Sequence, residues 1–388
     1  MTEIEERLRA ELKAAAAQAQ PHLLRELTLP ARRRSRRSAR WLAPAAAVLA
    51  VAIVVLGVRI ALRPAPPGPA GRAGLLPQFY VAVPPWTHGA IVARSRTGAT
   101  LSRIEVPGAR VSGVSAAADD RTFALSASSG SGAAEVTRFY LVHLSASGRP
   151  GGLTVLPLAV HAGAAGYDVT GMALAPDGSR LAVAVVPLAL EGMHPTPAHR
   201  SRIEITAPGL GAARAWVAPA EVNISHLSWA TGGQRLGYLS EDVRGLPRQV
   251  PVTRVNVLDT TRPGPDLTTS SRSVTLRTGT SPVDAALISP SGDSAIAWVG
   301  PPAHGNAEVL AEYSMRTGQR QRVLYRGPGH GNFIVQADVL SADPSGRHLL
   351  VNFLTATGNR MLLARVDNGQ FTGLPVPGHS LLPTQAAW

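Results

Sequence analysis

Five stretches of this chain repeat one pattern, in which an apolar run, a short turn and a second apolar run follow one another. They are VSAAADDRTFALS (114–126), MALAPDGSRLAVAV (172–185), LSWATGGQRLGYLS (227–240), ALISPSGDSAIAWV (286–299) and LSADPSGRHLLVNF (340–353). Aligning their turns superimposes positions that lie 54 to 59 residues apart, namely Asp120, Gly178, Gly233, Gly292 and Gly346. Self-similarity at a nearly constant period predicts a repeat architecture, with one supersecondary unit per repeat.

Each unit is expected to hold four short strands. Residues such as Pro176, Asp177 and Gly178 favour a tight hairpin, because proline presets φ, aspartate bonds back to the backbone and glycine adopts positive φ. The flanking runs, such as RLAVAVV, are apolar at consecutive positions, which is typical of strands covered on both faces. A second hairpin follows in every unit, although the sequence does not place the last strand of the third. This pattern indicates β-propeller blades, with a β-sandwich as the alternative.

The two ends of the repeat region predict how the ring closes. The chain stops at LLPTQAAW (381–388), whose Ala387-Trp388 pair matches the end of an innermost strand in the third unit, with no partner strand after it. The partner is expected at the other end, where FYVAV (79–83) reads as a second strand and residues 90–106 as the next hairpin. We therefore expect an all-β, six-bladed β-propeller over residues 78–388, whose last blade is closed by both termini.

A membrane-spanning helix is predicted before the propeller. Residues 41–62 would form a helix about 33 Å long, enough to cross a hydrocarbon core of about 30 Å. An arginine block precedes it, and basic residues beside a span stay on the cytoplasmic side. The block comprises Arg32, Arg33, Arg34, Arg36, Arg37 and Arg40. The sequence thus predicts a single-pass protein with a cytoplasmic N-terminus and an extracytoplasmic C-terminal domain. A cleaved twin-arginine export signal and a buried core helix are the alternatives.

The segments on either side of the span have different compositions. Residues 1–40 form the predicted cytoplasmic tail, in which residues 2–19 read as a short helix with a capping box at Thr2 and Glu5. This helix could dock a cytoplasmic partner, or it could simply be a solvated or membrane-lying tail. Residues 63–77 are too rich in proline and glycine for a helix or a ladder, so they are expected to be an extended spacer.

Net charge and cysteine content exclude several functions. The chain carries a formal charge of +13, but its first 63 residues hold 12 basic and only 5 acidic side chains, so the propeller is mildly basic. No aromatic residues alternate with the arginine block, which favours a membrane surface over nucleic acid. With no cysteine in the sequence, disulfides, thiolate metal sites and a thiol nucleophile are excluded.

The APDGSRLAVAV and SPSGDSAIAWV units are similar to the hairpin repeats of TolB-type and WD-type propellers. The full order of acidic short helix, arginine block, single span, proline-rich spacer and propeller resembles single-pass membrane proteins of actinobacteria. This resemblance implies localisation and fold, and no reaction.

The propeller sequence contains no recognisable catalytic motif, and the GDSA segment at Gly292 lies in a repeated structural turn. No metal site and no cofactor are predicted. Seven histidines fall in the longer loops, which share one face of the disc. They form a candidate binding face, because imidazole titrates near neutral pH and binds metals. These residues are His88, His161, His194, His199, His304, His330 and His379. The simpler explanation is that longer loops hold more residues.

Three functions remain open from the sequence. The first is a binding, scaffold or sensor module without catalysis, which binds a protein partner and relays to the cytoplasm through the tail. The second is a cell-envelope hydrolase or lyase using the propeller channel, which requires acids or histidines at the channel mouth. The third is a purely structural envelope protein with a featureless surface.

Overall fold

The computed structural model describes residues 77–83, 90–163, 166–187, 200–210, 212–243, 252–262, 264–279, 281–300, 309–326, 334–343, 345–355, 360–367, 370–374 and 385–388. The predicted tail, span and spacer, including the arginine block, lie outside these residues. None of the helices within these ranges is long and apolar enough to cross a bilayer.

The described strands form six antiparallel sheets of four strands each, which we number as blades. The first blade contains β4 (Arg110–Ala116), β5 (Thr122–Ser129), β6 (Val136–His143) and β7 (Thr154–His161), with a 3-10 turn, η2 (Gly132–Ala134). The second contains β8 (Tyr167–Leu174), β9 (Leu181–Pro187), β10 (Arg202–Thr206) and β11 (Arg214–Val217). The third contains β12 (Val222–Trp229), β13 (Arg235–Asp242), β14 (Val252–Asp259), α3 (Leu267–Ser270) and β15 (Ser271–Val274).

The remaining three sheets follow the same plan. The fourth blade contains β16 (Val283–Ile288), β17 (Ser294–Val299), β18 (Val309–Ser314) and β19 (Arg320–Arg326). The fifth contains β20 (Ile334–Ala342), β21 (His348–Thr355), β22 (Arg360–Asp367) and β23 (Gln370–Gly373). The sixth contains β24 (Gln385–Ala387), β1 (Phe79–Val83), β2 (Ala90–Ser95) and β3 (Thr100–Glu105).

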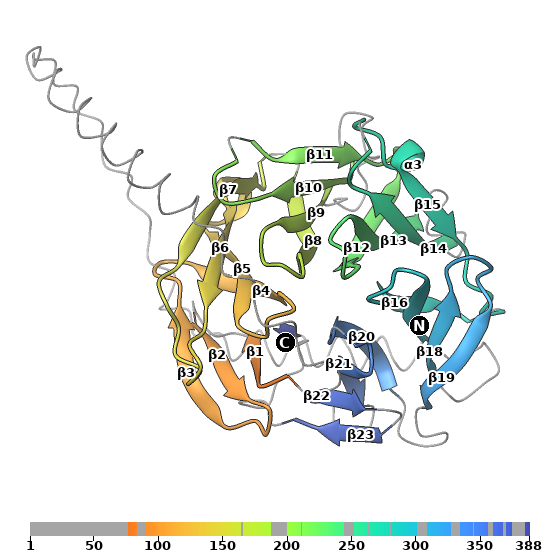
Figure 1. Ribbon diagram of the computed structural model, residues 1–388. Helices are drawn as coiled ribbons and strands as arrows, with labels where there is room; N and C mark the ends of the chain where they lie inside the picture. Colours follow the sequence, from red (N-terminus) through yellow and green to blue (C-terminus); the bar gives the residue numbers. More distant parts are fainter. Residues whose placement is uncertain are drawn as a thin grey trace, which may run out of the picture. The chain divides into compact units, whose positions relative to one another are not determined.

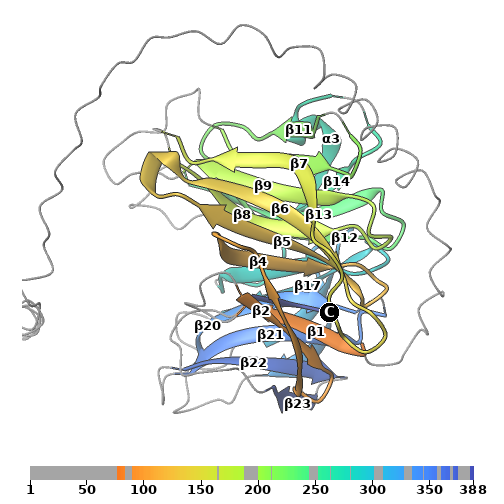
Figure 2. The ribbon, with the colours of Figure 1, turned by 90° about the vertical axis from the view of Figure 1, so that its left-hand side faces the viewer.

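The innermost strands contact one another in a closed cycle, in the order β4, β8, β12, β16, β20, β24 and back to β4. Figure 1 looks along this ring, with the sheets arranged around a common centre. Figure 2 shows the ring from the side. The prediction of a six-bladed β-propeller is confirmed, and the two-layer β-sandwich is excluded by the cyclic order.

The sixth blade joins the two ends of the described chain. Strand β24 pairs antiparallel with β1, and Val81 lies opposite Ala387 while Val83 lies opposite Gln385. In Figure 1 the C-terminus accordingly lies beside β1. The sequence-based assignment of residues 79–83 to the second strand of a composite blade is therefore confirmed.

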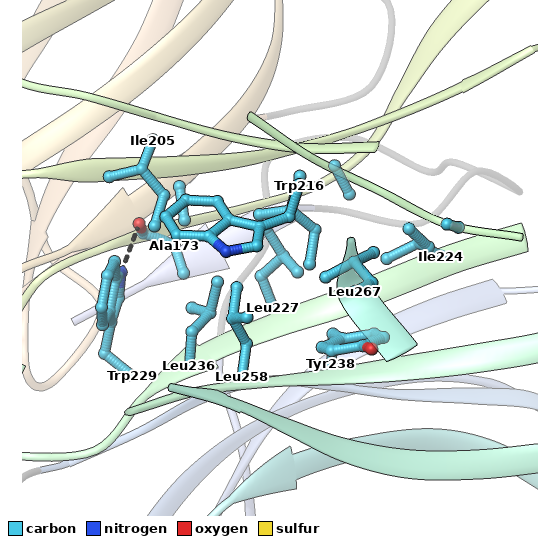
Figure 3. Packing of buried hydrophobic residues seen from close by; sticks show 14 of the residues in the cluster. Ala173, Ile205, Trp216, Ile224, Leu227, Trp229, Leu236, Tyr238, Leu258 and Leu267 are labelled. Carbon is cyan, nitrogen blue, oxygen red and sulfur yellow. Dashed lines mark hydrogen bonds between the residues drawn. The ribbon is translucent and has the colours of Figure 1, made fainter. Parts of the chain in front are cut away.

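Burial on both faces explains the consecutive apolar residues. In β9, the side chains of Leu181, Val183 and Val185 pack toward the first blade, with Phe139 and Leu156. The alternate residues of the strand pack in the opposite direction, toward the third blade. That cluster includes Ala182, Ala184, Trp216, Trp229, Leu236 and Leu258 (Figure 3). Each central strand thus contributes to two cores, one on each side of its blade.

The first hairpin of each blade turns at its aligned position. Gly178, Gly233, Gly292 and Gly346 have φ between 63° and 73°, the left-handed region that glycine enters without steric cost. Asp120 occupies the same position in the first blade with φ 56°. Aspartate is among the few residues that tolerate this region, so the departure from the Pro-Asp-Gly pattern does not change the turn.

The third blade contains a feature that its sequence did not reveal. A single helical turn, α3, precedes its last strand, and the Asp266 carboxylate caps the turn by accepting from the backbone N–H groups of Thr268 and Thr269. Strand β15 then pairs with β14, with Val255 opposite Val274. The last strand therefore begins after the polar segment in which the sequence pattern was lost.

Outer strands also bond to the following blade. The hydroxyl of Ser102 in β3 donates to the carbonyl of Gly148 at 2.6 Å. Likewise, the N–H of Val217 donates to the carbonyl of Pro265 at 2.6 Å, and that of Arg277 to the carbonyl of Gly318 at 2.7 Å. In each case the outermost strand of one blade, or the segment directly after it, contacts the outer part of the next blade.

Close packing between the third and fourth blades predicts a strong position effect for two glycines. A Cβ atom at Gly237 would lie 2.4 Å from Ile288 Cγ2, whereas one at Gly232 would meet nothing within 4 Å. We expect G237A to lower the free energy of unfolding by about 2–3 kcal/mol, because a branched side chain in a filled core cannot move aside. G232A should change it by less than about 0.5 kcal/mol. Urea unfolding of both variants measures the difference, and equal stabilities would contradict the packing.

Candidate functional site

A cavity of about 110 Å³ lies on the ring axis, at the mouth where the first hairpin of each blade turns. All six innermost strands contribute their last residues to it. Each blade contributes one residue to a first ring of lining residues, which lies five positions before the turn residue (Asp120 in the first blade). This ring consists of Ser115, Ala173, Ser228, Leu287, Ser341 and Ala387. The next ring consists of Ala116, Leu174, Trp229, Ile288, Ala342 and Trp388. The repeat therefore brings equivalent positions of all six blades to the same level.

Hydrogen bonds between neighbouring blades hold this mouth together. The hydroxyl of Ser115 in the first blade accepts from the N–H of Leu174 in the second at 2.9 Å. The third and fourth blades repeat this bond, because Ser228 Oγ accepts from Ile288 N–H at 2.8 Å. In these two blade pairs a serine in one blade orients the neighbouring innermost strand.

The first-hairpin turns of the same two blade pairs are also joined by hydrogen bonds. The N–H of Ala118 donates to the carbonyl of Pro176 at 2.9 Å, and that of Thr231 donates to the carbonyl of Pro290 at 2.8 Å. A proline at position 118 or 231 would have no N–H to donate. The two turns without a proline at this position are thus the ones that donate these backbone hydrogen bonds across a blade boundary.

Two tryptophans at equivalent positions of opposite blades line the cavity differently. Trp229 Nε1 donates to the carbonyl of Ala173 at 2.9 Å (Figure 3). The guanidinium of Arg180 lies 5.1 Å from the Trp229 ring centroid, within the range of a cation–π contact. Trp388 Nε1 is buried and has no hydrogen-bond partner within the described part of the chain. Trp229 is therefore fixed by two contacts that Trp388 lacks.

The lining of this cavity contains little charge. Asp343 is the charged residue among those lining the cavity. Its carboxylate accepts from the N–H groups of Ser345, Arg347 and His348 and from the Ser345 hydroxyl, so it stabilises its own turn. Among the residues that the structure describes, no group of three or more histidine, cysteine, aspartate or glutamate side chains could hold a metal ion. Most residues that line the cavity are apolar in type, although polar atoms make up more than half of the surface that they present to it.

A half-buried carboxyl lies beside this mouth, where the composite blade closes. Asp120 Oδ2 accepts from the N–H of Gln78, immediately before β1, at 2.9 Å. Burial raises the pKa of Asp120 and the bond from Gln78 lowers it; the Asp119 and Asp343 carboxylates raise it as well, against the charge of Arg121. Asp120 therefore links the first blade to the composite blade through a partly desolvated group.

The opposite mouth of the channel is more polar. Asp168 and Asp284 lie near the starts of β8 and β16, and His226 lies in β12 with φ 53°, at a bulge in its pairing with β13. Desolvation raises the pKa of Asp284, while the charge of His226 acts in the opposite direction. His226 Nδ1 lies 2.8 Å from the Ser225 hydroxyl. Asp168, Asp284 and His226 thus place titratable groups on three successive innermost strands.

The structure describes one of the seven candidate histidines. His161 ends β7 and is exposed at the face from which the longer loops leave. His88, His194, His199, His304, His330 and His379 lie outside the described residues, so the proposed histidine face stays a prediction. The axial cavity and His226 were missed from the sequence. Aligning the blades would have revealed the alternation of Ser115, Ser228 and Ser341 with apolar residues.

Comparisons with known proteins do not assign a family. No protein-family profile and no curated protein matches the sequence. The solved structure of TolB from Acinetobacter baumannii is similar, with 15% identity over 80% of this chain and a TM-score of 0.49. This chain spans 65% of the length of that structure.

Two enzymes are also among the similar structures. A variant of Synechocystis apocarotenoid oxygenase has 13% identity over 78% of this chain and 73% of its own, with a TM-score of 0.45. A prolyl endopeptidase has 14% identity over 87% of this chain and 56% of its own, with a TM-score of 0.42. Because these identities and TM-scores are low, the fold assignment is based on the sheet topology of this chain.

The raised pKa of Asp120 predicts a pH-dependent stability. A carboxyl whose pKa is higher in the folded state binds its proton more tightly when folded, so its contribution to stability falls as pH rises through the folded pKa. We expect the thermal midpoint of D120N, relative to the wild type, to be highest near pH 7 and to decline toward pH 4. D293N serves as the control for losing one exposed carboxylate. A D120N difference that is constant across this range would contradict the assignment.

Proposed function

We propose that this chain is a membrane-anchored, extracytoplasmic β-propeller that acts as a binding, scaffold or sensor module without catalysis. Its partner is a protein that inserts one apolar side chain into the axial cavity at the mouth formed by the first hairpins. The main support is the lining of that cavity, in which the residues are mostly apolar in type and lie among serine and threonine hydroxyls, while the one carboxylate is occupied by its own turn.

The size of the cavity favours a protein partner over a small metabolite. Sites for drug-sized ligands enclose about 300–1,000 Å³, whereas this one encloses about 110 Å³. An apolar cavity of about 150 Å³ is sufficient for benzene, so the volume suits a single side chain. Protein interfaces are commonly anchored by one such residue in a central pocket, surrounded by a polar rim.

A cell-envelope hydrolase or lyase is the alternative function. It would use the long-loop mouth, where Asp284, whose pKa is raised, lies near His226. Raised carboxyl pKa values are typical of general acids, which is the observation favouring this alternative. An enzyme of this kind would lose turnover in D284N, whereas the binding module would not.

Anchoring and topology rest on the sequence. The apolar segment 41–62 is long enough to span a bilayer, and the arginine block before it favours a cytoplasmic N-terminus. Under this proposal the propeller lies outside the cytoplasmic membrane, and residues 1–40 are available to a cytoplasmic partner. An actinobacterial source remains part of the proposal.

Site-specific photocrosslinking tests the binding module. With p-benzoylphenylalanine in place of Thr231, which is exposed at the cavity mouth, we expect the full chain to crosslink one discrete protein in its native cells. The product should disappear in A342L, because the larger side chain occupies the cavity. The same label at Val155, 59% exposed on outer strand β7, should not give it. A product unaffected by A342L, with the variant's thermal midpoint unchanged, would argue against insertion at this mouth.

The absence of cysteine makes topology simple to measure. We expect a membrane-impermeant maleimide to label A146C in intact cells, because Ala146 is exposed in the outer turn of the first blade. S35C, within the arginine block, should be labelled only after permeabilisation. Labelling of both sites in intact cells, or of neither, would contradict the proposed orientation.

A further inference from the structure

An arginine-rich surface lies on the outer rim of the third and fourth blades, away from both channel mouths. Between Asp266 and Asp284 the sequence contains two arginines and no acidic residue, and between Glu312 and Asp338 it contains four arginines and no acidic residue. All six side chains are exposed. We call them the arginine strip, which consists of Arg272, Arg277, Arg316, Arg320, Arg322 and Arg326.

The two stretches meet in the fold. Arg277 N–H donates to the carbonyl of Gly318 at 2.7 Å, which places the segment after β15 against the turn that carries Arg316. Strand β19 then continues from this turn, with Arg320 at its first position and Arg326 at its last. Figure 1 shows β15 and β19 on neighbouring parts of the rim. The strip is therefore continuous across a blade boundary.

Few carboxylates neutralise these guanidinium groups. Arg322 Nη2 lies 3.0 Å from Glu312 Oε2, and its side chain remains 60% exposed. The guanidinium groups of the other five arginines have no ion pair or hydrogen bond within the described ranges. Arg110 pairs with Glu135 and Arg262 with Asp259, whereas the six arginines of the strip lie close together with a single carboxylate partner among them within the described ranges. The strip is thus a local excess of positive charge.

A purely structural explanation accounts for part of the strip only. Charged residues on an outer strand prevent edge-to-edge pairing of sheets, and this suffices for Arg320, Arg322 and Arg326 in β19. It does not account for Arg277 and Arg316, which lie in a loop and a turn.

A groove continues the positive surface toward the fifth blade. Arg322 and Arg347, from neighbouring blades, both line a groove of about 140 Å³. Val323, Leu324, Leu349 and Val366 line the same groove, so the two cations lie beside apolar surface. Arginines from three consecutive blades therefore line one side of the disc.

We propose that the arginine strip binds a linear, phosphate-bearing polymer in an extended conformation along β19. Arg320 and Arg322 lie on either side of Gln321, where the pairing of β19 with β18 is irregular, and both side chains are exposed on the same stretch of the rim. Guanidinium groups bind phosphate through two parallel hydrogen bonds. This surface is separate from the axial cavity, and its function does not depend on the binding proposed there.

Single-stranded nucleic acid fits this surface less well. Proteins that bind it present aromatic rings on which bases stack. The aromatic side chain within the strip, Tyr325, is half-buried, and its ring centroid lies 6.3 Å from that of Trp298. An anionic polymer without bases therefore suits the strip better.

Salt-dependent binding of long-chain polyphosphate tests the proposal, using the full chain in a neutral detergent. The strip variant is R272Q/R316Q/R320Q, and the matched control is R103Q/R138Q/R149Q, whose three exposed arginines lie in the sixth and first blades. Both variants lose the same charge and keep the arginine block, and urea unfolding verifies that each is folded.

We expect the strip variant to bind at least about tenfold more weakly and the control to bind within about threefold of the wild type. Each lost phosphate contact should reduce the slope of log K against log [NaCl] by about 0.7–0.9, so the strip variant should lose about 2–3 units of slope. Equal losses in the two variants would show attraction to overall charge and overturn the proposal. It would also be overturned if the wild type bound oligo(dT) of equal charge as tightly as polyphosphate.

Discussion

The pairing of β24 with β1 is the constraint on which the rest of the structure depends. Pairing through Val81 and Ala387 gives β1 its inner partner strand, and it brings Trp388 to the level of Trp229 on the opposite side of the ring. Without this pair the innermost strands could not form a cycle, and the cavity that all six of them line would open on one side. Both the axial cavity and the link from Asp120 to Gln78 follow from that single junction.

Within the closed ring, neighbouring blades are not equivalent. The first and third blades supply a serine acceptor and a turn N–H donor to the blade that follows, and the second and fourth supply a proline carbonyl. The absence of proline at Ala118 and Thr231 therefore has a structural reason, since a proline at either position would remove the backbone N–H that donates to the next blade. The two turns that lack proline are therefore complementary to the proline-containing turns of the blades that follow them.

The chemistry of the propeller is distributed over three separate surfaces. The mouth at the first hairpins encloses a small cavity, the innermost strands carry Asp168, Asp284 and His226 away from that cavity, and the outer rim carries the arginine strip. A small cavity with one carboxylate in its lining and a rim rich in arginine are suited to different partners. This separation favours a module with more than one binding surface, and it places any general acid away from the cavity that would hold an apolar anchor.

The sequence alone determined the repeat, the number of strands per blade and the composite sixth blade, because turn chemistry and consecutive apolar residues are local properties. It also determined the candidate span and the arginine block, which depend only on composition. Tertiary structure decided which residues share the axial cavity, since Ser115, Ser228 and Trp388 meet only after ring closure. It likewise decided that Arg277 lies against Gly318, because this contact joins residues from different blades. The capped helical turn before β15 was also visible only in the structure, because a single turn has no periodic sequence pattern.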